Sequence, residues 1–133
     1  MSLYPKKYPL FRLQPSHLFW VRAKVGGRGI SPISVRLLVD TGSSFTIVPP
    51  RVITNIGCDL DSAPRRYRIT TGSGKISAPV VRVPWFNCIG KTVRDFELVA
   101  YDVPPGLRVD GLLGMDFLDR FGVTIAIADR QIQ

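Results

Sequence analysis

Short apolar runs separated by glycine and proline are the feature of this sequence that most restricts its fold. The chain has 133 residues, and its 12 glycines and 11 prolines interrupt apolar stretches that are too short for a helical bundle. Glycine and proline break helices and mark turns, and several short apolar runs between turn signals are typical of β-proteins. Apolar residues make up 45% of the chain, which is enough for one hydrophobic core. We therefore expect a single all-β domain.

Alternation of apolar and polar residues locates the strands. In residues 17–25, Arg22 and Lys24 alternate with apolar neighbours, which is the pattern of a half-buried strand. The glycines of residues 72–74 lie between two β-prone runs and predict the tip of a long hairpin. We expect strands over residues 17–25, 34–39, 45–48, 66–71, 75–83, 91–93, 96–100, 111–114 and 123–128.

The fold class that follows is all-β with one short helix near the C-terminus, over residues 115–121. A further short helix can form over residues 51–57 and end at Gly57. The helix of residues 115–121 is expected to have an apolar face of Met115, Leu118 and Phe121, and an outward face of Asp116, Asp119 and Arg120.

Residues 1–15 are basic and rich in proline, so we treat them as an N-terminal arm before a domain of residues 16–133. No long apolar segment follows Lys6 and Lys7, and we identify no signal peptide. No part of the sequence is apolar over the length that crossing a bilayer requires. The expected location is the cytoplasm, where Cys58 and Cys88 would stay reduced, although one disulfide is arithmetically possible.

A net charge of +8, from 18 basic and 10 acidic residues, raises the question of nucleic-acid binding. The basic residues do not gather in one block, and no known nucleic-acid motif is visible, so we expect no specific nucleic-acid partner. A basic RNA-binding barrel is a third, weaker hypothesis, and it requires aromatic residues on exposed strand faces among the basic ones. Trp20, Trp85 and Phe86 are the candidates, but such aromatic residues more often lie in the core.

Asp40 ends an apolar run in the stretch LLVDTGSSF, residues 37–45. Its neighbours are turn formers, so the stretch alone fits an ordinary turn as well as a catalytic carboxylate. Peptide hydrolysis without a metal or a covalent nucleophile needs a general base and a general acid, and two adjacent carboxylates that share one proton supply both. The chain has a single histidine, which excludes a His-rich metal site, and we expect neither metal nor cofactor.

Three motifs follow one another along the chain. Asp-Thr-Gly-Ser at residues 40–43 precedes the Gly-Ser-Gly of residues 72–74, and Leu-Leu-Gly at residues 112–114 runs into the last predicted helix with Met-Asp-Phe-Leu. In this order, over residues 18–129, the chain resembles the single-lobed retropepsin-like aspartic proteases of cellular and bacterial type. The resemblance implies a closed β-barrel of the acid-protease kind and an aspartic endopeptidase activity on peptide or protein substrates.

The resemblance also assigns roles. Asp40 is the catalytic residue, Thr41 holds two such loops together, and Gly42 lets the substrate backbone approach. The Ser43 hydroxyl is expected to donate to the outer oxygen of Asp40 and favour its charged form. Residues implied for the flap are Thr71, Gly72, Ser73 and Gly74, and those for the second active-site motif are Leu112, Leu113 and Gly114.

The Asp-Thr-Gly motif occurs only once, because neither Asp110 nor Asp116 is followed by Thr-Gly or Ser-Gly. An active site of this type must then be built from two copies of the chain. We expect a homodimer with two-fold symmetry and Asp40 of each subunit at the axis. The two carboxylates would titrate as a unit and activate a water molecule between them.

The chain departs from retroviral members of the family at two places. Ser44 and Phe45 stand where those members usually have acidic residues that hold the substrate backbone, and Met115 stands where they usually have arginine. Their substrate contacts and dimer salt bridges therefore do not transfer. Besides an active protease, the sequence allows a catalytically silent domain of the same fold that serves oligomerisation or peptide binding. The intact motif around Asp40 favours the enzyme.

Overall fold

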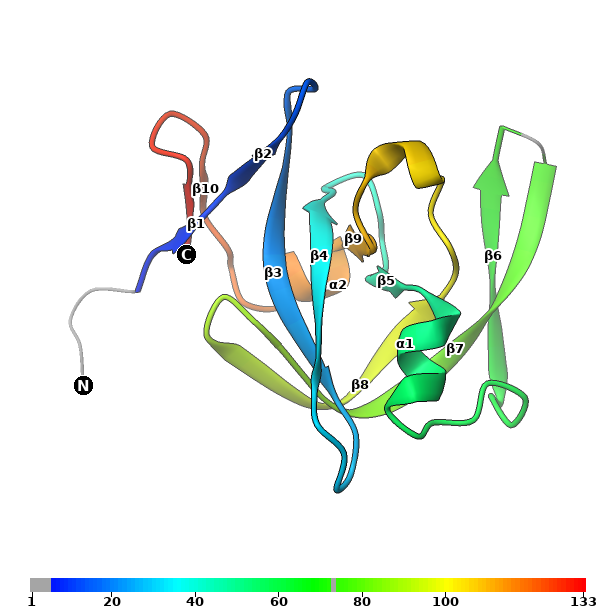
Figure 1. Ribbon diagram of the computed structural model, residues 1–133. Helices are drawn as coiled ribbons and strands as arrows, with labels where there is room; N and C mark the ends of the chain where they lie inside the picture. The colour runs from blue at the N-terminus through cyan, green and yellow to red at the C-terminus, as the bar shows by residue number, and fades with distance from the viewer. Residues whose placement is uncertain (1–5, 73) are drawn as a thin grey trace.

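The computed structural model of the chain describes residues 6–72 and 74–133 (Figure 1). Its main body is a closed barrel of six strands. They follow one another in the order β3–β4–β9–β5–β8–β7, and β7 pairs with β3 to close the barrel. This confirms the predicted all-β barrel. The barrel strands are β3 (Leu18–Gly26), β4 (Ile33–Val39), β5 (Ile47–Val48), β7 (Gly74–Cys88), β8 (Lys91–Ala100) and β9 (Gly111–Leu113).

Two pairs in the barrel are parallel and bring together segments far apart in the sequence. β4 runs beside β9, with Leu37 opposite Gly111 and Val39 opposite Leu113. β5 runs parallel to β8. The remaining neighbours, such as β3–β4 and β7–β8, are antiparallel. The β4–β9 pair therefore sets the first and third sequence motifs next to each other.

Part of the segment expected as an N-terminal arm forms strands. β1 (Tyr8–Pro9) pairs with β11 (Gln131–Ile132), which also pairs with β10 (Ile125–Ala126), and β2 (Phe11–Leu13) pairs with β3. The C-terminal strand is thus β11, and the strand predicted over residues 123–128 is reduced to β10. Figure 1 shows β1, β10 and the C-terminus together at one side of the barrel.

The described residues form two short α-helices, α1 (Pro50–Asn55) and α2 (Met115–Leu118), and a 3₁₀ turn, η1 (Pro105–Leu107). α1 confirms the short helix considered over residues 51–57. The face predicted for the C-terminal helix is wrong in part, because Phe117 is fully buried and Met115 is 38% exposed. The reason is length: a helix of one turn has no continuous stripe, so the adjacent loop decides which side chains are covered.

The core fills the barrel and includes Val21, Ala23 and Val25, as the alternation in β3 predicted. Cys88 is buried and Cys58 is half-buried, and both thiols are free, so the disulfide alternative is wrong. Loss of solvation raises the pKa of Cys88 to about 12. This thiol therefore stays protonated and packs as a small apolar side chain.

β7 changes its inward face halfway along its length. Val83 and Phe86 are both fully buried, although strict alternation would put them on opposite faces. Pro84 lies between them at a gap in the β7–β8 register, which pairs Val83 with Phe96 and Trp85 with Arg94. Asp95, on the other side of this gap, has a positive φ of 53°. Such a local twist is how strands turn the corner of a closed barrel. Beyond the corner, alternate residues of β7, starting with Trp85, lie on the outer face.

Candidate active site

Asp40 directly follows β4, where this strand runs beside β9. Its backbone N–H donates to the Leu113 carbonyl at 3.0 Å and extends the ladder by one residue. Its side chain Oδ1 accepts a hydrogen bond of 2.9 Å from the Gly42 N–H, and the Ser43 N–H donates to the Asp40 carbonyl at 3.1 Å. The carboxylate is held by a tight turn of its own backbone, which the turn-forming residue types favour.

The segment of residues 40–46, here called the Asp40 loop, lies against the second motif. Two N–H groups at the start of α2 donate to the carbonyls of Ser43 and Ser44, at 2.8 and 3.1 Å. A Cβ atom on Gly114 would lie 2.5 Å from the Phe45 carbonyl oxygen, so only glycine fits there. The Asp40 loop and the second active-site motif, residues 112–114, are therefore in direct backbone contact.

The two leucines of the second motif face different surroundings. Leu113 is fully buried in the barrel core. Leu112 is half-buried and packs on a smaller apolar cluster around Ile47, which includes Phe45 of the Asp40 loop. β9 thus anchors in the barrel core through Leu113 and packs through Leu112 on the cluster that also includes Phe45.

A buried threonine joins the Asp40 loop to α2. Thr46 is fully buried, and its Oγ1 donates to Oδ1 of Asp116 at 2.7 Å while accepting from the Gly114 N–H at 3.1 Å. Oδ2 of Asp116 accepts from the Thr46 N–H at 3.0 Å, and the Phe117 N–H donates to Oδ1 at 2.9 Å. These four contacts are called the Thr46–Asp116 bridge below.

The prediction that Asp116 points outward from its helix is wrong. The carboxylate folds back onto the Phe117 N–H of α2 and onto Thr46. It supplies an acceptor for the N–H and the hydroxyl of the buried Thr46, and a buried donor without an acceptor is costly. Sequence reasoning missed the bridge, although both residues are single polar positions within apolar runs, FTIV and MDFL. That pattern is the signal that could have indicated a buried polar pair.

Burial raises the pKa of Asp116, and the hydrogen bonds from Thr46 and Phe117 oppose the rise. Because the pKa is higher in the folded state, the folded protein binds this proton more tightly than the unfolded chain. The contribution of Asp116 to stability is therefore full below the unfolded pKa of about 3.9. It is lost as the pH rises through the folded pKa.

Ser43 has a different partner from the one expected. Its hydroxyl donates to the Phe45 carbonyl at 2.7 Å, and a hydroxyl has only one proton to donate. The expected hydrogen bond from Ser43 to Asp40 is therefore wrong in this structure. Thr41 and Gly42 are exposed at the turn of the loop. Within residues 6–72 and 74–133, the Thr41 side chain makes no hydrogen bond.

The β6–β7 hairpin carries the residues expected for the flap. β6 (Arg65–Thr71) pairs with β7 along its whole length, down to Thr71 opposite Gly74. Gly72 is exposed at the tip, and Ser73 lies outside the described residues. In the view of Figure 1, the tip and the loop after β4 both lie at the upper end of the molecule.

An aromatic contact connects this hairpin to the Asp40 loop. The rings of Phe45 and Tyr67 lie 4.4 Å apart between centroids, at 59°. Both pack on the smaller apolar cluster, whose buried members are Ile47, Ala78, Val80 and Val99. An apolar surface therefore extends from the hairpin to the loop that holds Asp40.

Asp110, just before β9, has a structural partner on each carboxylate oxygen. Its Oδ1 forms an ion pair of 2.9 Å with Arg51 of α1, and its Oδ2 accepts from the Arg36 N–H at 2.7 Å. Both acidic residues that flank the second motif, Asp110 and Asp116, are thus bonded to groups other than Asp40.

Over the described part of the chain, no three or more His, Cys, Asp or Glu side chains are grouped so that they could hold a metal ion. Among the same residues, no helix has the length and apolar character needed to cross a membrane.

Removing the Thr46 hydroxyl should loosen the site. We expect Thr46→Val to lower the free energy of unfolding by about 1–3 kcal/mol, because the Gly114 N–H and one Asp116 oxygen lose a buried partner. Thr54→Val is the matched control, since the Thr54 hydroxyl is exposed and bonds only within α1. Urea denaturation of both variants measures the difference. Equal stability of the two variants would show that the bridge carries little energy.

A family profile described as aspartyl protease matches residues 21–117, well over half of the chain. The crystal structure of a retropepsin-like aspartic protease from Rickettsia conorii is similar with a TM-score of 0.62 and 22% sequence identity. The alignment covers 96% of this chain and 97% of that one, and no curated protein matches the sequence. The chain belongs to the aspartyl protease family and has the retropepsin-like fold.

Proposed function

We propose that this protein is an aspartic endopeptidase that is active as a homodimer. The observation that carries the proposal is the Asp40 loop: a half-exposed carboxylate, fixed by its own backbone turn and by the second motif. The flanking carboxylates of Asp110 and Asp116 are occupied by structural partners. The second carboxylate of a dyad is therefore expected from another copy of the chain.

The chemistry needs one proton shared by the two Asp40 side chains. The ionised carboxylate takes a proton from a water molecule while the water oxygen adds to the scissile carbonyl carbon. The protonated carboxylate first donates toward the carbonyl oxygen, and a proton then passes to the leaving nitrogen as the C–N bond breaks. No covalent bond forms between the enzyme and the substrate, and no nucleophile other than water is required.

Thr41 is proposed to contact the partner subunit. It stands next to Asp40, is exposed, and its hydroxyl has no hydrogen-bond partner among the residues that the structure describes. A free hydroxyl beside the symmetry axis is suited to bond the equivalent loop of a second copy. The contact would align the two carboxylates.

The tip of the β6–β7 hairpin is proposed to act as a flap over bound substrate. Gly72 has open space around its Cα, whereas Gly74 has a positive φ of 120°. A hairpin that opens and closes lets a polypeptide enter and then excludes water during the reaction. The Phe45–Tyr67 contact supports this role, because it couples the base of the hairpin to the Asp40 loop.

The first prediction from the proposed function concerns Asp40. Replacing it by Asn removes the general base, so peptide hydrolysis should fall by about 10²–10⁴-fold or more while the fold is kept. Asp119→Asn makes the same chemical change at an exposed position and should leave turnover unchanged. Cleavage of a peptide library at several pH values tests both variants. Full activity of Asp40→Asn would exclude this mechanism, and an inactive wild type would favour the silent alternative.

The second prediction concerns assembly. At concentrations where dimers dominate, an equal amount of Asp40→Asn protein should remove about half of the wild-type activity, because half of the wild-type chains then sit in mixed dimers. On dilution, activity should fall faster than linearly. Thr41→Val should raise the dimer dissociation constant without changing the unfolding of the monomer. Sedimentation alongside the assay measures assembly, and an active species that stays monomeric would refute the dimer.

The third prediction concerns the flap. Gly72→Val should reduce turnover by about tenfold, equivalent to about 1.4 kcal/mol in the barrier, because a branched side chain stiffens the tip. Thermal stability should hardly change, since a Cβ at Gly72 meets no other atom. Gly74→Val is unsuitable, because its φ disfavours any L side chain. If Gly72→Val instead melts at lower temperature with turnover intact, the tip is an ordinary turn.

A further inference from the structure

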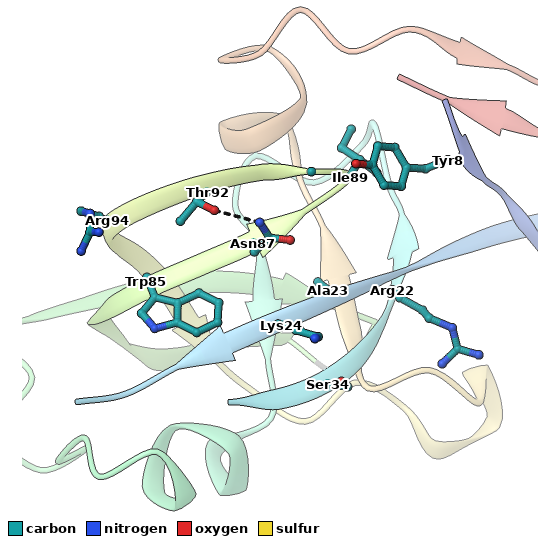
Figure 2. Close-up of a pocket in the computed structure, with 11 residues that line it drawn as sticks. Tyr8, Arg22, Ala23, Lys24, Ser34, Trp85, Asn87, Ile89, Thr92 and Arg94 are labelled. Atoms are coloured by element: carbon teal, nitrogen blue, oxygen red, sulfur yellow. Dashed lines mark hydrogen bonds between the residues drawn. The ribbon is translucent and has the colours of Figure 1, made fainter. Parts of the chain in front are cut away.

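A cavity of about 720 Å³ lies on the outer face of the barrel, where β3, β4, β7 and β8 meet (Figure 2). No residue of the Asp40 loop lines it. Its walls combine short polar side chains, one tryptophan and several basic side chains with Ala23, Ile89 and Gly90, and Tyr8 of β1 lies at one end. Neither the packing of the barrel nor the proposed proteolysis uses this cavity.

The strand register aligns the polar side chains in one row across four strands. Lys24 of β3 stands opposite Ser34 of β4 on one side and Asn87 of β7 on the other, and Asn87 stands opposite Thr92 of β8. Residues paired in this way project from the same face. Asn87 Nδ2 donates to Thr92 Oγ1 at 2.8 Å, the dashed line in Figure 2. The Thr92 hydroxyl proton and the Asn87 carbonyl oxygen remain for a ligand.

Trp85 forms an aromatic wall of the cavity. Its register partner on β3 is Gly26, and a Cβ atom on Gly26 would overlap the indole, so the ring lies directly against the β3 backbone. On β8 its partner is Arg94. Figure 2 shows the indole between Arg94 and Lys24. The half-buried ring is thus held in place by the backbone, flanked by two cations, and in contact with the cavity.

The charge around the cavity has one sign. Arg22, Lys24 and Arg94 line it, and Arg36 stands opposite Arg22 in the register. All four are exposed, no acidic residue is among the lining residues, and none of the four belongs to an ion pair found in the described part of the chain. Like charges on neighbouring strands repel each other, so this face favours an anionic ligand.

We propose that this groove binds single-stranded nucleic acid without reading its sequence. One base stacks on Trp85, and the adjacent phosphates lie at Lys24, Arg94 and Arg22. Proteins that bind single-stranded nucleic acid without sequence preference combine a positively charged groove, which follows the phosphate backbone, with an aromatic side chain on which a base stacks. Sequence matters little, because every base has a face that can stack. An acidic peptide would use the same cations but leave the indole without a partner. Asp40 takes no part in this binding, so protein without peptidase activity should bind equally well.

Trp85 has the position that the hypothesis of a basic RNA-binding barrel requires. That hypothesis required an aromatic residue outside the core among basic residues. Phe86 is buried in the barrel core. Trp20 is also buried but belongs to neither core cluster, because Phe11 stacks on its ring and the guanidinium groups of Arg22 and Arg36 lie over it. Trp85 is the exception, because the corner of β7 turns it outward beside Lys24 and Arg94.

Fluorescence anisotropy with labelled octauridylate and octathymidylate tests the proposal on the full chain carrying Asp40→Asn. Both strands should bind, since stacking and phosphate contacts do not use the 2′-hydroxyl. Lys24→Gln and Arg94→Gln should each weaken binding several-fold and lower the slope of log affinity against log salt by about 0.7. Trp85→Leu should weaken binding about tenfold with the salt slope unchanged.

Arg28→Gln is the matched control, because Arg28 is an exposed cation outside this groove. An equal loss of affinity in Arg28→Gln and Lys24→Gln would overturn the proposal in favour of general charge. Unchanged binding by folded Trp85→Leu protein would also overturn it. A third result would overturn it as well, namely that octaglutamate displaces the labelled strand at the same concentration as unlabelled octauridylate does. If Trp85→Leu does not fold, the comparison of Lys24 and Arg94 with Arg28 decides.

Discussion

The Thr46–Asp116 bridge is the contact on which the proposed active site depends. One hydroxyl donates to the carboxylate of α2 and accepts from the backbone of Gly114, so a single buried atom joins the Asp40 loop to the second motif. Buried polar groups cost most when only some of their bonds are made, because the remaining groups have no water to replace the lost partner. The bridge therefore favours one arrangement of the loop and makes intermediate arrangements unfavourable.

In the proposed enzyme, one chain supplies one half of the active site. Asp40 is oriented by its own turn, by Leu113 and by the bridge behind it, all within the chain. What the half-site lacks is a second carboxylate, since the neighbouring acids are held by arginine, threonine and backbone groups. In the proposed enzyme, association would then supply a chemical group and would not need to reorganise the fold. Such preorganisation lowers the cost of assembly.

The corner of the barrel at Pro84 and Asp95 has two consequences. It lets β7 close onto β3 while keeping Val83 and Phe86 in the core. The same turn places Trp85 on the outer face, next to basic residues of β3 and β8. The Asp40 loop follows the C-terminal end of β4, whereas Ser34 of the groove stands near its N-terminal end. The proposed catalytic and nucleic-acid surfaces are therefore built from different parts of the same strands.

The sequence by itself determined the position of most barrel strands, the turn around Asp40 and the order of its motifs, because alternation and turn chemistry are local properties of the chain. It divided β8 into two strands and ended β7 at residue 83, before the corner, whereas β8 is continuous over Lys91–Ala100 and β7 reaches Cys88. It did not reveal the inward Asp116, the Phe45 partner of Ser43, or the outward Trp85. Each of these depends on what another strand or loop places nearby: Thr46, some 70 residues from Asp116, the fold of the Asp40 loop itself, and Gly26 across from the indole. Only the tertiary structure decides such contacts, because hydrogen-bond partners and buried faces are assigned by packing between distant segments and not by periodicity.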